Sequence, residues 1–341
     1  MHLKQMLKTG VAGFTLASCS GMAWADATPD SLSALKSMSL EDLGEVRVYT
    51  VVAASKFEQK TTEAPASVSV VTQEEIKRYG YRTLADILGS LQGFNVSYDR
   101  DYSYLGVRGL NLGDDNSRVL LLVDGHRINN NINDSAAIGT DFLLDVDLIE
   151  RVEVIRGPGS VLYGNNAFFG VINVITRKGG QVNGVEASAE YAGFDTYKVR
   201  FTAGKSFTNG ISFLLSGSHY DSAGAEHLYY PQFDQRSSSY YGAANNGVAQ
   251  NQDGDSFSSL FGSVSYWDLT LAGGYIHREK VNPTAPNFTT FNDPRSRTVD
   301  DRGYRRPTNC WRQPRSDFPK PFTRVPFPAA SKPCLVGDTW M

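Results

Sequence analysis

The glycines at Gly157–Gly159 and Gly164 are the residues whose spacing comes nearest to a phosphate-binding loop. A dinucleotide-binding loop needs G-x-G-x-x-G and a P-loop needs G-x-x-x-x-G-K-[ST], since their backbone N–H groups must face the phosphates. Leu162 stands where the first pattern needs its third glycine, and Gly164 is followed by two asparagines. A nucleophile elbow needs G-x-S-x-G, which the Gly-Pro-Gly-Ser run does not supply. We therefore predict a structural turn without phosphate or catalytic chemistry.

The remaining reactive residue types give no site either. No cysteine lies between Cys19 and Cys310, so no disulfide framework holds the body of the chain. His126 is a lone histidine beside a predicted turn, and such histidines are more often hydrogen-bonded than metal-bound. Without a zinc-type cluster, an acid-base pair or a nucleophile set, we expect no metal, no cofactor and no enzyme. The net charge of -3 argues against nucleic-acid binding.

The N-terminus has the organisation of an export signal. Lys4 and Lys8 precede the apolar run 11–17, and Ala-Trp-Ala at 23–25 is a cleavage site, so residues 1–25 are predicted to be a signal peptide. A lipoprotein processing site at 16–19 is the alternative. No later apolar run is long enough for a transmembrane helix, so membrane insertion would require a β-barrel.

Residues 61–180 are predicted to form a compact α/β unit. Thr72 and Glu75 form a capping box that opens a helix through about Tyr79, and Thr83 and Asp86 open a second one that ends at Gly93. Apolar residues of the second helix fall on one face, at Leu84, Ile87, Leu88 and Leu91. Strands are predicted at 67–71, 94–98, 119–123 and 171–175. The polar stretch Asn129 to Asp134 is a long loop and a candidate for binding.

Residues 181–301 change to a period-two pattern. Five segments of about 9 to 11 residues alternate apolar and polar side chains, as transmembrane barrel strands do. They begin near Val185, Tyr197, Ile211, Leu260 and Leu269. Two turns, 193–195 and 208–210, are short, whereas 222–256 is long and polar, which is typical of outer-membrane barrels. A soluble β-sandwich is the alternative, because its strands also alternate.

Residues 302–341 do not have the alternating pattern of barrel strands. Seven of the chain's 14 prolines and two of its three cysteines lie between 303 and 341. Proline removes a donor from the ladder, so we expect no central strand in this tail. The abrupt change of composition is typical of a shifted reading frame or a truncated gene, and we expect the chain to be an incomplete form.

Four segments carry a resemblance to a known family: "APASVSVVTQEEIKRYGYRTLADILGSLQGFNV", "GVRGL", "RVLLLVDGHRI" and "IERVEVIRGPGSVLYGNNAFFGVINVITRKG". In their order and spacing the chain resembles a TonB-dependent outer-membrane receptor of the siderophore and cobalamin type, over its signal, plug domain and first barrel strands. The resemblance implies an α+β plug domain followed by the start of an antiparallel transmembrane β-barrel, which has roughly 22 strands in the family. Phe169 replaces a glycine found in many members, which leaves the substrate subfamily open.

The resemblance also implies a function, namely energy-coupled uptake of a scarce ligand, foremost a ferric siderophore. A TonB-type energy-coupling protein would capture a coupling box at about 45–52, within a periplasmic segment at 26–60, by strand addition. From composition alone that stretch is an ordinary edge strand. The residues expected in the captured segment are Val46, Val48, Val51 and Val52. The further partners implied are outer-membrane lipid and a metal-chelate or cobalamin-like ligand.

Two sets of plug residues acquire roles through the resemblance. Arg108 and Arg156 match family arginines that pair with barrel glutamates and lock the plug to the wall, since a charge in a lumen needs a partner. Position in the fold implies ligand contacts from Tyr98, Tyr102, Tyr104, Asn129, Asn131 and Asn133. The alternatives are a solvated arginine at a strand end and an ordinary polar loop.

Other functions stay open at this stage. A receptor for cobalamin or another nutrient is one alternative, and a truncated plug-like binding module in the periplasm that does not transport is another. An exported β-rich enzyme is disfavoured. We expect the outer membrane as the location, or the periplasm where the truncated chain cannot insert.

Overall fold

The computed structural model describes residues 50–51, 59–60, 67–110, 115–236, 242–267, 269–286 and 289–309. Thr50–Val51 forms β1, which pairs antiparallel with β2 (Gln59–Lys60). Of the four valines expected in the captured segment, Val51 alone lies in the described ranges. Outside these ranges lie the other three, Val46, Val48 and Val52, together with the expected signal peptide and residues 310–341. No described helix is long and apolar enough to cross a membrane.

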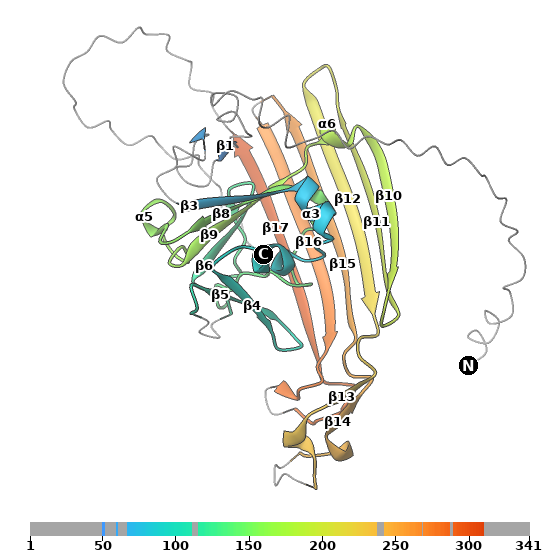
Figure 1. Cartoon of the computed structure of the whole chain (residues 1–341). Coiled ribbons are helices and arrows are strands. Elements are labelled where there is room, and N and C mark those ends of the chain that lie inside the picture. The colour runs from blue at the N-terminus through green and yellow to red at the C-terminus, as the bar shows by residue number, and fades with distance from the viewer. Residues whose placement is uncertain are drawn as a thin grey trace, which may run out of the picture. The chain divides into compact units, whose positions relative to one another are not determined.

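The α/β unit is built on a five-stranded sheet of order β3-β8-β9-β6-β7 (Figure 1). Its strands are β3 (Ser67–Thr72), β8 (Ile149–Arg156), β9 (Gly170–Thr176), β6 (Val119–Val123) and β7 (His126–Arg127). β6 and β9 run parallel, and the other pairs are antiparallel. Every residue of β6 is buried because each face of this sheet has its own apolar cluster.

The two predicted helices are confirmed, with one boundary corrected. α3 (Gln73–Tyr79) and α4 (Leu84–Gly89) both begin at the capping boxes described above. α4 ends at Gly89 and not at Gly93, because the Ser90 N–H closes the last turn onto the Asp86 and Leu88 carbonyls. Leu91 lies outside the helix but still packs against the core. A separate hairpin, β4 (Phe94–Tyr98) and β5 (Ser103–Val107), follows.

The glycine turn is structural, as predicted, but it does not reverse the chain by itself. The Gly157 N–H donates to the Phe169 carbonyl at 3.0 Å and the Gly159 N–H to the Ala167 carbonyl at 2.8 Å, so the pairing of β8 with its returning partner continues past Arg156. The reversal lies beyond them and includes α5 (Ser160–Tyr163), a one-turn helix that the sequence did not predict. A Cβ at Gly159 would lie 2.8 Å from Val171 Cγ2, which explains the second glycine.

Six long strands form a second sheet, which we call the wall, of order β10-β11-β12-β15-β16-β17 (Figure 1). They are β10 (Gly184–Ala192), β11 (Thr196–Ser206), β12 (Ile211–Ser222), β15 (Asp255–Tyr266), β16 (Leu269–Val281) and β17 (Arg297–Asn309). All neighbours are antiparallel. The predicted tail boundary at 302 is wrong, since β17 runs through it. As the last described strand of the sheet, β17 can include Pro307 because an edge strand tolerates a missing donor.

The predicted alternation on the wall is confirmed. Apolar side chains such as Val199, Phe201 and Leu271 are exposed on the outer face, whereas Arg200 and Thr202 are buried on the inner face. The described parts of the loops between β12 and β15 and between β16 and β17 lie at one end of the strands, the long-loop end. The turns at 207–210 and at Trp267 lie at the other end, the short-turn end. The short turn 193–195 belongs to the long-loop end.

Candidate functional site between the α/β unit and the wall

The α/β unit lies against the inner face of the wall. One apolar cluster contains the main core of the unit together with Leu214, Phe261, Ile276 and Tyr304 from four wall strands. Around this shared core, polar contacts join the two parts at both ends of the strands. Two groups of these contacts form the candidate functional site, and separate contacts join Lys198 to Asp145 and Arg306 to the Asp124 carbonyl.

The first group, which we call the Arg278 cluster, lies near the long-loop end. Arg278 on β16 is 1% exposed, and its Nε lies 2.9 Å from Thr140 Oγ1 and 3.2 Å from Asp255 Oδ1. Its Nη1 donates to Asp300 Oδ2 at 3.1 Å, and its Nη2 donates to the Asp101 carbonyl at 2.7 Å. One guanidinium thus bridges three wall strands and two loops of the α/β unit, using the planar fork that a lysine lacks.

The tip of the β4–β5 hairpin is the part of the unit held here. The Tyr102 hydroxyl donates to Asp300 Oδ1 at 2.9 Å, and the Arg278 guanidinium lies 5.5 Å from the Tyr102 ring centroid. Thr298 Oγ1 donates to Asp101 Oδ2 at 2.7 Å. The hairpin tip therefore combines these contacts with the wall and internal hydrogen bonds to Asp99, which accepts from the Asp101 and Tyr102 N–H groups and from the Tyr104 hydroxyl.

Three further ion pairs surround the Arg278 cluster. Asp253 binds Lys280 at 3.0 Å and Arg100 at 3.1 Å, and Arg302 lies 3.2 Å from Asp141. Four cations thus face five carboxylates, which leaves one carboxylate in excess: Arg100, Arg278, Lys280 and Arg302 against Asp101, Asp141, Asp253, Asp255 and Asp300. Burial raises the pKa of both Asp101 and Asp141, although nearby arginines oppose that rise.

The second group, the Glu186 network, joins the end of the unit to the first two wall strands. Arg177 is buried and binds Glu186 on β10 through both terminal nitrogens, at 2.7 and 2.9 Å. Arg200 on β11 lies 3.5 Å from the same carboxylate and 3.2 Å from Asp147 in η2 (Val146–Leu148). The hydrogen bonds to Glu186 raise the pKa of Arg177, so this pair stays ionised.

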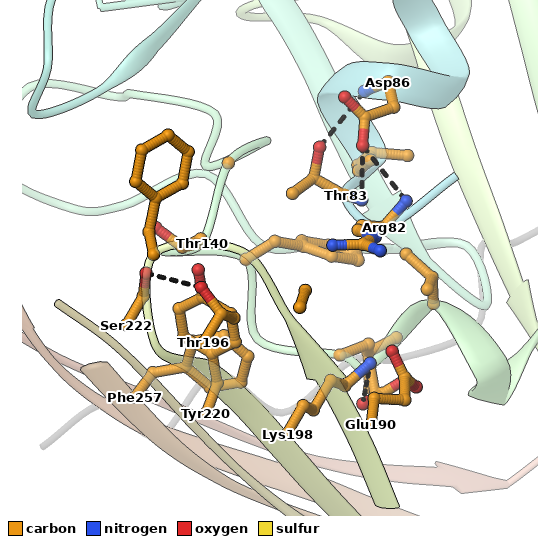
Figure 2. Close-up of a pocket in the computed structure, with 18 of the residues that line it drawn as sticks. Arg82, Thr83, Asp86, Thr140, Glu190, Thr196, Lys198, Tyr220, Ser222 and Phe257 are labelled. Carbon is orange, nitrogen blue, oxygen red and sulfur yellow. Dashed lines mark hydrogen bonds and ion pairs between the residues drawn. The ribbon is translucent and has the colours of Figure 1, made fainter. Parts of the chain in front are cut away.

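A cavity of about 540 Å³ lies between the start of α4 and strands β10 to β12 and β15 (Figure 2). Its lining combines apolar and aromatic side chains, including Phe142 and the stacked rings of Tyr220 and Phe257 at 5.1 Å, with polar and charged ones such as Arg82 and Glu190. Lys198 in this lining is bound to the buried Asp145 at 2.8 Å. The volume lies within the range of small-molecule sites, so the cavity can hold an organic group of that size.

The structure brings part of the predicted ligand set together. Tyr102, Tyr104 and Asn133 line one cavity of about 240 Å³, and Asn129 and Asn131 line another of about 270 Å³. The two cavities share Asn130, Ile132, Asp141 and Arg302 in their linings. Burial raises the pKa of both tyrosine hydroxyls, so they remain neutral hydrogen-bonding groups at neutral pH.

Two members of that set are placed differently. Asn129 is 2% exposed, accepts from the Leu121 N–H and donates to the Val119 and Asp134 carbonyls, so its amide holds the loop in place and is not free for a ligand. Tyr98 is about half exposed and lines neither cavity.

The two arginines of the expected lock make no described contact with the wall. Arg156 donates to the Gln92 carbonyl at 2.9 Å and to Ser69 Oγ at 2.6 Å, both inside the α/β unit. Arg108 is exposed, with its Nη2 near Gly157. Their lock role therefore stays a prediction, and the wall contacts described here come from residues that sequence reasoning missed.

Those missed residues had a signal in the sequence. Arg200 and Arg278 fall at polar positions of alternating strands, and Arg177 directly follows a buried strand. His126 stacks on Tyr304 at 5.7 Å, and no group of residues that could hold a metal ion is found among the described residues.

The fold described is a plug-like α/β unit on the inner face of an open antiparallel wall, the arrangement expected for the first part of a plugged outer-membrane barrel. Residues 60–171 match the family model described as TonB-dependent Receptor Plug Domain. Over this plug domain the chain is therefore assigned to the TonB-dependent receptors.

Known relatives agree with this assignment. The chain is 39% identical over 179 residues to the vitamin B12 transporter BtuB of Vibrio vulnificus, which is 51% of this chain and 28% of that protein. It is 39% identical over 132 residues to the iron-regulated outer membrane virulence protein of Vibrio cholerae, covering 38% and 20%. It thus spans less than a third of the length of these relatives.

A solved structure agrees in fold. The pyoverdine outer membrane receptor FpvA from Pseudomonas aeruginosa PAO1, bound to pyoverdine, superposes with a TM-score of 0.53 at 17% identity, over 76% of this chain and 36% of that one. At this identity the likeness concerns the fold alone.

Proposed function

We propose that this chain is part of a receptor for the energy-coupled uptake of a ferric siderophore across the outer membrane. The observation that carries the proposal is the Arg278 cluster, in which buried charges hold the plug on the inner face of the wall. Removing one partner of a buried ion pair costs about 3–5 kcal/mol, so a plug held in this way needs work to move. A TonB-type protein that captures the segment around Val46, Val48, Val51 and Val52 would supply that work.

The ligand site that we propose is the pair of cavities lined by Tyr102, Tyr104, Asn131 and Asn133, with the long-loop end facing outward. Neutral phenols and amides there can hydrogen-bond the oxygen atoms of a metal chelate. Iron is favoured by the similarity to an iron-regulated outer-membrane protein, and cobalamin is the second candidate because a vitamin B12 transporter is similar over a longer stretch.

Growth of a deletion strain tests the proposal. On a single ferric siderophore as iron source, across a panel of chemical classes, the deletion strain should fail where its parent grows, and the intact gene should restore growth. Failure on cobalamin alone would establish the second candidate. Equal growth of both strains on every source would refute uptake.

Membrane fractionation tests whether this chain inserts. We expect it in the outer membrane, with a gel mobility that changes on heating, as a folded barrel wall requires. A soluble periplasmic product would instead support a plug-like binding module that does not transport.

A further inference from the structure

We propose that Arg278 is a positioning residue, through which the wall holds the tip of the ligand-facing β4–β5 hairpin while the base of the plug is held separately. The description of this hairpin as ligand-facing rests on the proposed function. The positioning itself rests on the contacts. The plug would thus have a releasable part at Asp99–Tyr102 and a fixed part at the Glu186 network.

The two ends of the hairpin are held by different forces. Its base is packed in the apolar core, where Leu105 and Val107 are almost completely buried. Its tip has no apolar anchor of this kind, and β4 is largely exposed. Because β4 and β5 pair with each other and not with the five-stranded sheet, polar contacts with the wall attach the tip to the rest of the described chain, while hydrogen bonds to Asp99 hold the turn itself.

Arg278 is the centre of those contacts. It reaches the hairpin directly, through the Asp101 carbonyl at 2.7 Å and the face of the Tyr102 ring. It also fixes Asp300, the acceptor of the Tyr102 hydroxyl, through a bond of 3.1 Å. Loss of the guanidinium would remove the cation that Asp255 and Asp300 share. The tip would then lose the direct and the indirect support of Arg278 and keep the contacts of Thr298 with Asp101 and of Arg100 with Asp253.

The base of the plug does not depend on Arg278. It is held through Arg177, Glu186, Arg200 and Asp147, and in the contacts described these residues share no partner with the Arg278 cluster. Sites without shared partners act additively. A change at one group should therefore loosen that part of the plug and leave the other part protected.

Hydrogen exchange followed by mass spectrometry on the full chain, purified from membranes in detergent, tests this inference. In Arg278→Gln we expect amides of residues 97–104 to exchange at least about tenfold faster than in the parent, with residues 149–176 unchanged. Arg200→Gln is the matched control, a buried wall arginine of the other group. It should leave residues 97–104 within about twofold of the parent and speed exchange at 177–186.

Two further variants keep the test decisive if Arg278→Gln does not fold. Asp101→Asn keeps the size of the side chain and removes one charge from the tip, so it should speed exchange at 97–104 with little effect elsewhere. Arg278→Lys keeps the charge but not the fork, and it should restore protection of the tip only in part. A purely structural role for Arg278 would speed exchange throughout the plug.

Exchange that rises evenly in all segments, or a tip that stays protected in both Arg278→Gln and Asp101→Asn, would overturn the inference. The experiment needs no ligand and no transport. A receptor whose tip behaves as expected but whose deletion strain grows on every source would retain the positioning role and lose the proposed function. A deletion strain that fails to grow on one source, combined with a tip that stays protected, would support the proposed function and overturn the positioning role.

Discussion

The short helix α6 (Gly179–Val182) leads from the plug to the wall, and we call it the joint. Gly179 is its most constrained glycine. A Cβ at this position would lie 2.0 Å from the Phe213 carbonyl oxygen and 2.9 Å from the Lys205 carbonyl oxygen. Its Cα also lies 3.1 Å from the place of a Cβ on Gly204. Both obstructing atoms are wall backbone, which cannot rotate away as a side chain can. We therefore predict that Gly179→Ala separates the joint from the wall.

The magnitude follows from that geometry. An ordinary contact is at least 3.4 Å, so the helix or a strand must shift by more than 1 Å. Overpacking of this kind costs about 1–3 kcal/mol, and rigid backbone on the far side favours the upper end of the range. A loss of about 3 kcal/mol should lower the thermal midpoint by at least about 5 °C.

Thermal unfolding of the full chain in detergent, followed by circular dichroism, measures the effect. Gly193→Ala is the control, because nothing lies within 4 Å of a Cβ there and its φ is not in the left-handed region. It should change the stability by no more than about 0.5 kcal/mol. If Gly179→Ala and Gly193→Ala both have the thermal midpoint of the parent, Gly179 is not packed against the backbone of the wall.

Two smaller predictions follow from the site. Asn129→Ala should cost about 1–3 kcal/mol of stability by leaving a buried N–H and two carbonyls without their partner, whereas Asn131→Ala should leave the thermal midpoint unchanged. Burial raises the pKa of Asp141 in the folded chain, so its contribution favours folding at low pH and is lost as the pH rises from the usual carboxyl value to the raised one. Asp141→Asn should remove that part of the decline, seen as a flatter plot of thermal midpoint against pH in this window, and an unchanged plot would contradict it.

Local signals in the sequence were sufficient to predict most of the helices and strands. The capping boxes at Thr72 and Thr83 fix the starts of α3 and α4 because both partners of each box are three residues apart. Alternation fixes which face of each wall strand is apolar. The end of α4 and the one-turn helix α5 were not predicted, because each depends on backbone hydrogen bonds in a turn without a strong residue preference. The strand β17 was missed because its sequence is rich in charged residues and lacks a clear apolar alternation, and pairing with β16 stabilises it.

The sequence could place charges but not their partners. Arg200 and Arg278 occupy polar positions on the inner face of the wall, yet Asp101 lies in a hairpin turn and Asp147 in the one-turn 3-10 helix η2, where no period predicts side-chain direction. The resemblance to a family instead implied wall contacts for Arg108 and Arg156.

The distribution of charge has a physical consequence for plug movement. In the contacts at Asp101, Asp141, Asp145 and Asp147 the plug supplies the carboxylate and a wall strand supplies the cation. Among the described strands, β11 and β16 are held by ladders on both sides and β17 by its ladder with β16, so their cations are fixed in place. Loops can move without breaking such a ladder. The movable partner at these four contacts is therefore the plug carboxylate. Substitution of a plug carboxylate should change the release of the plug from the wall with less effect on the wall itself than substitution of a wall cation.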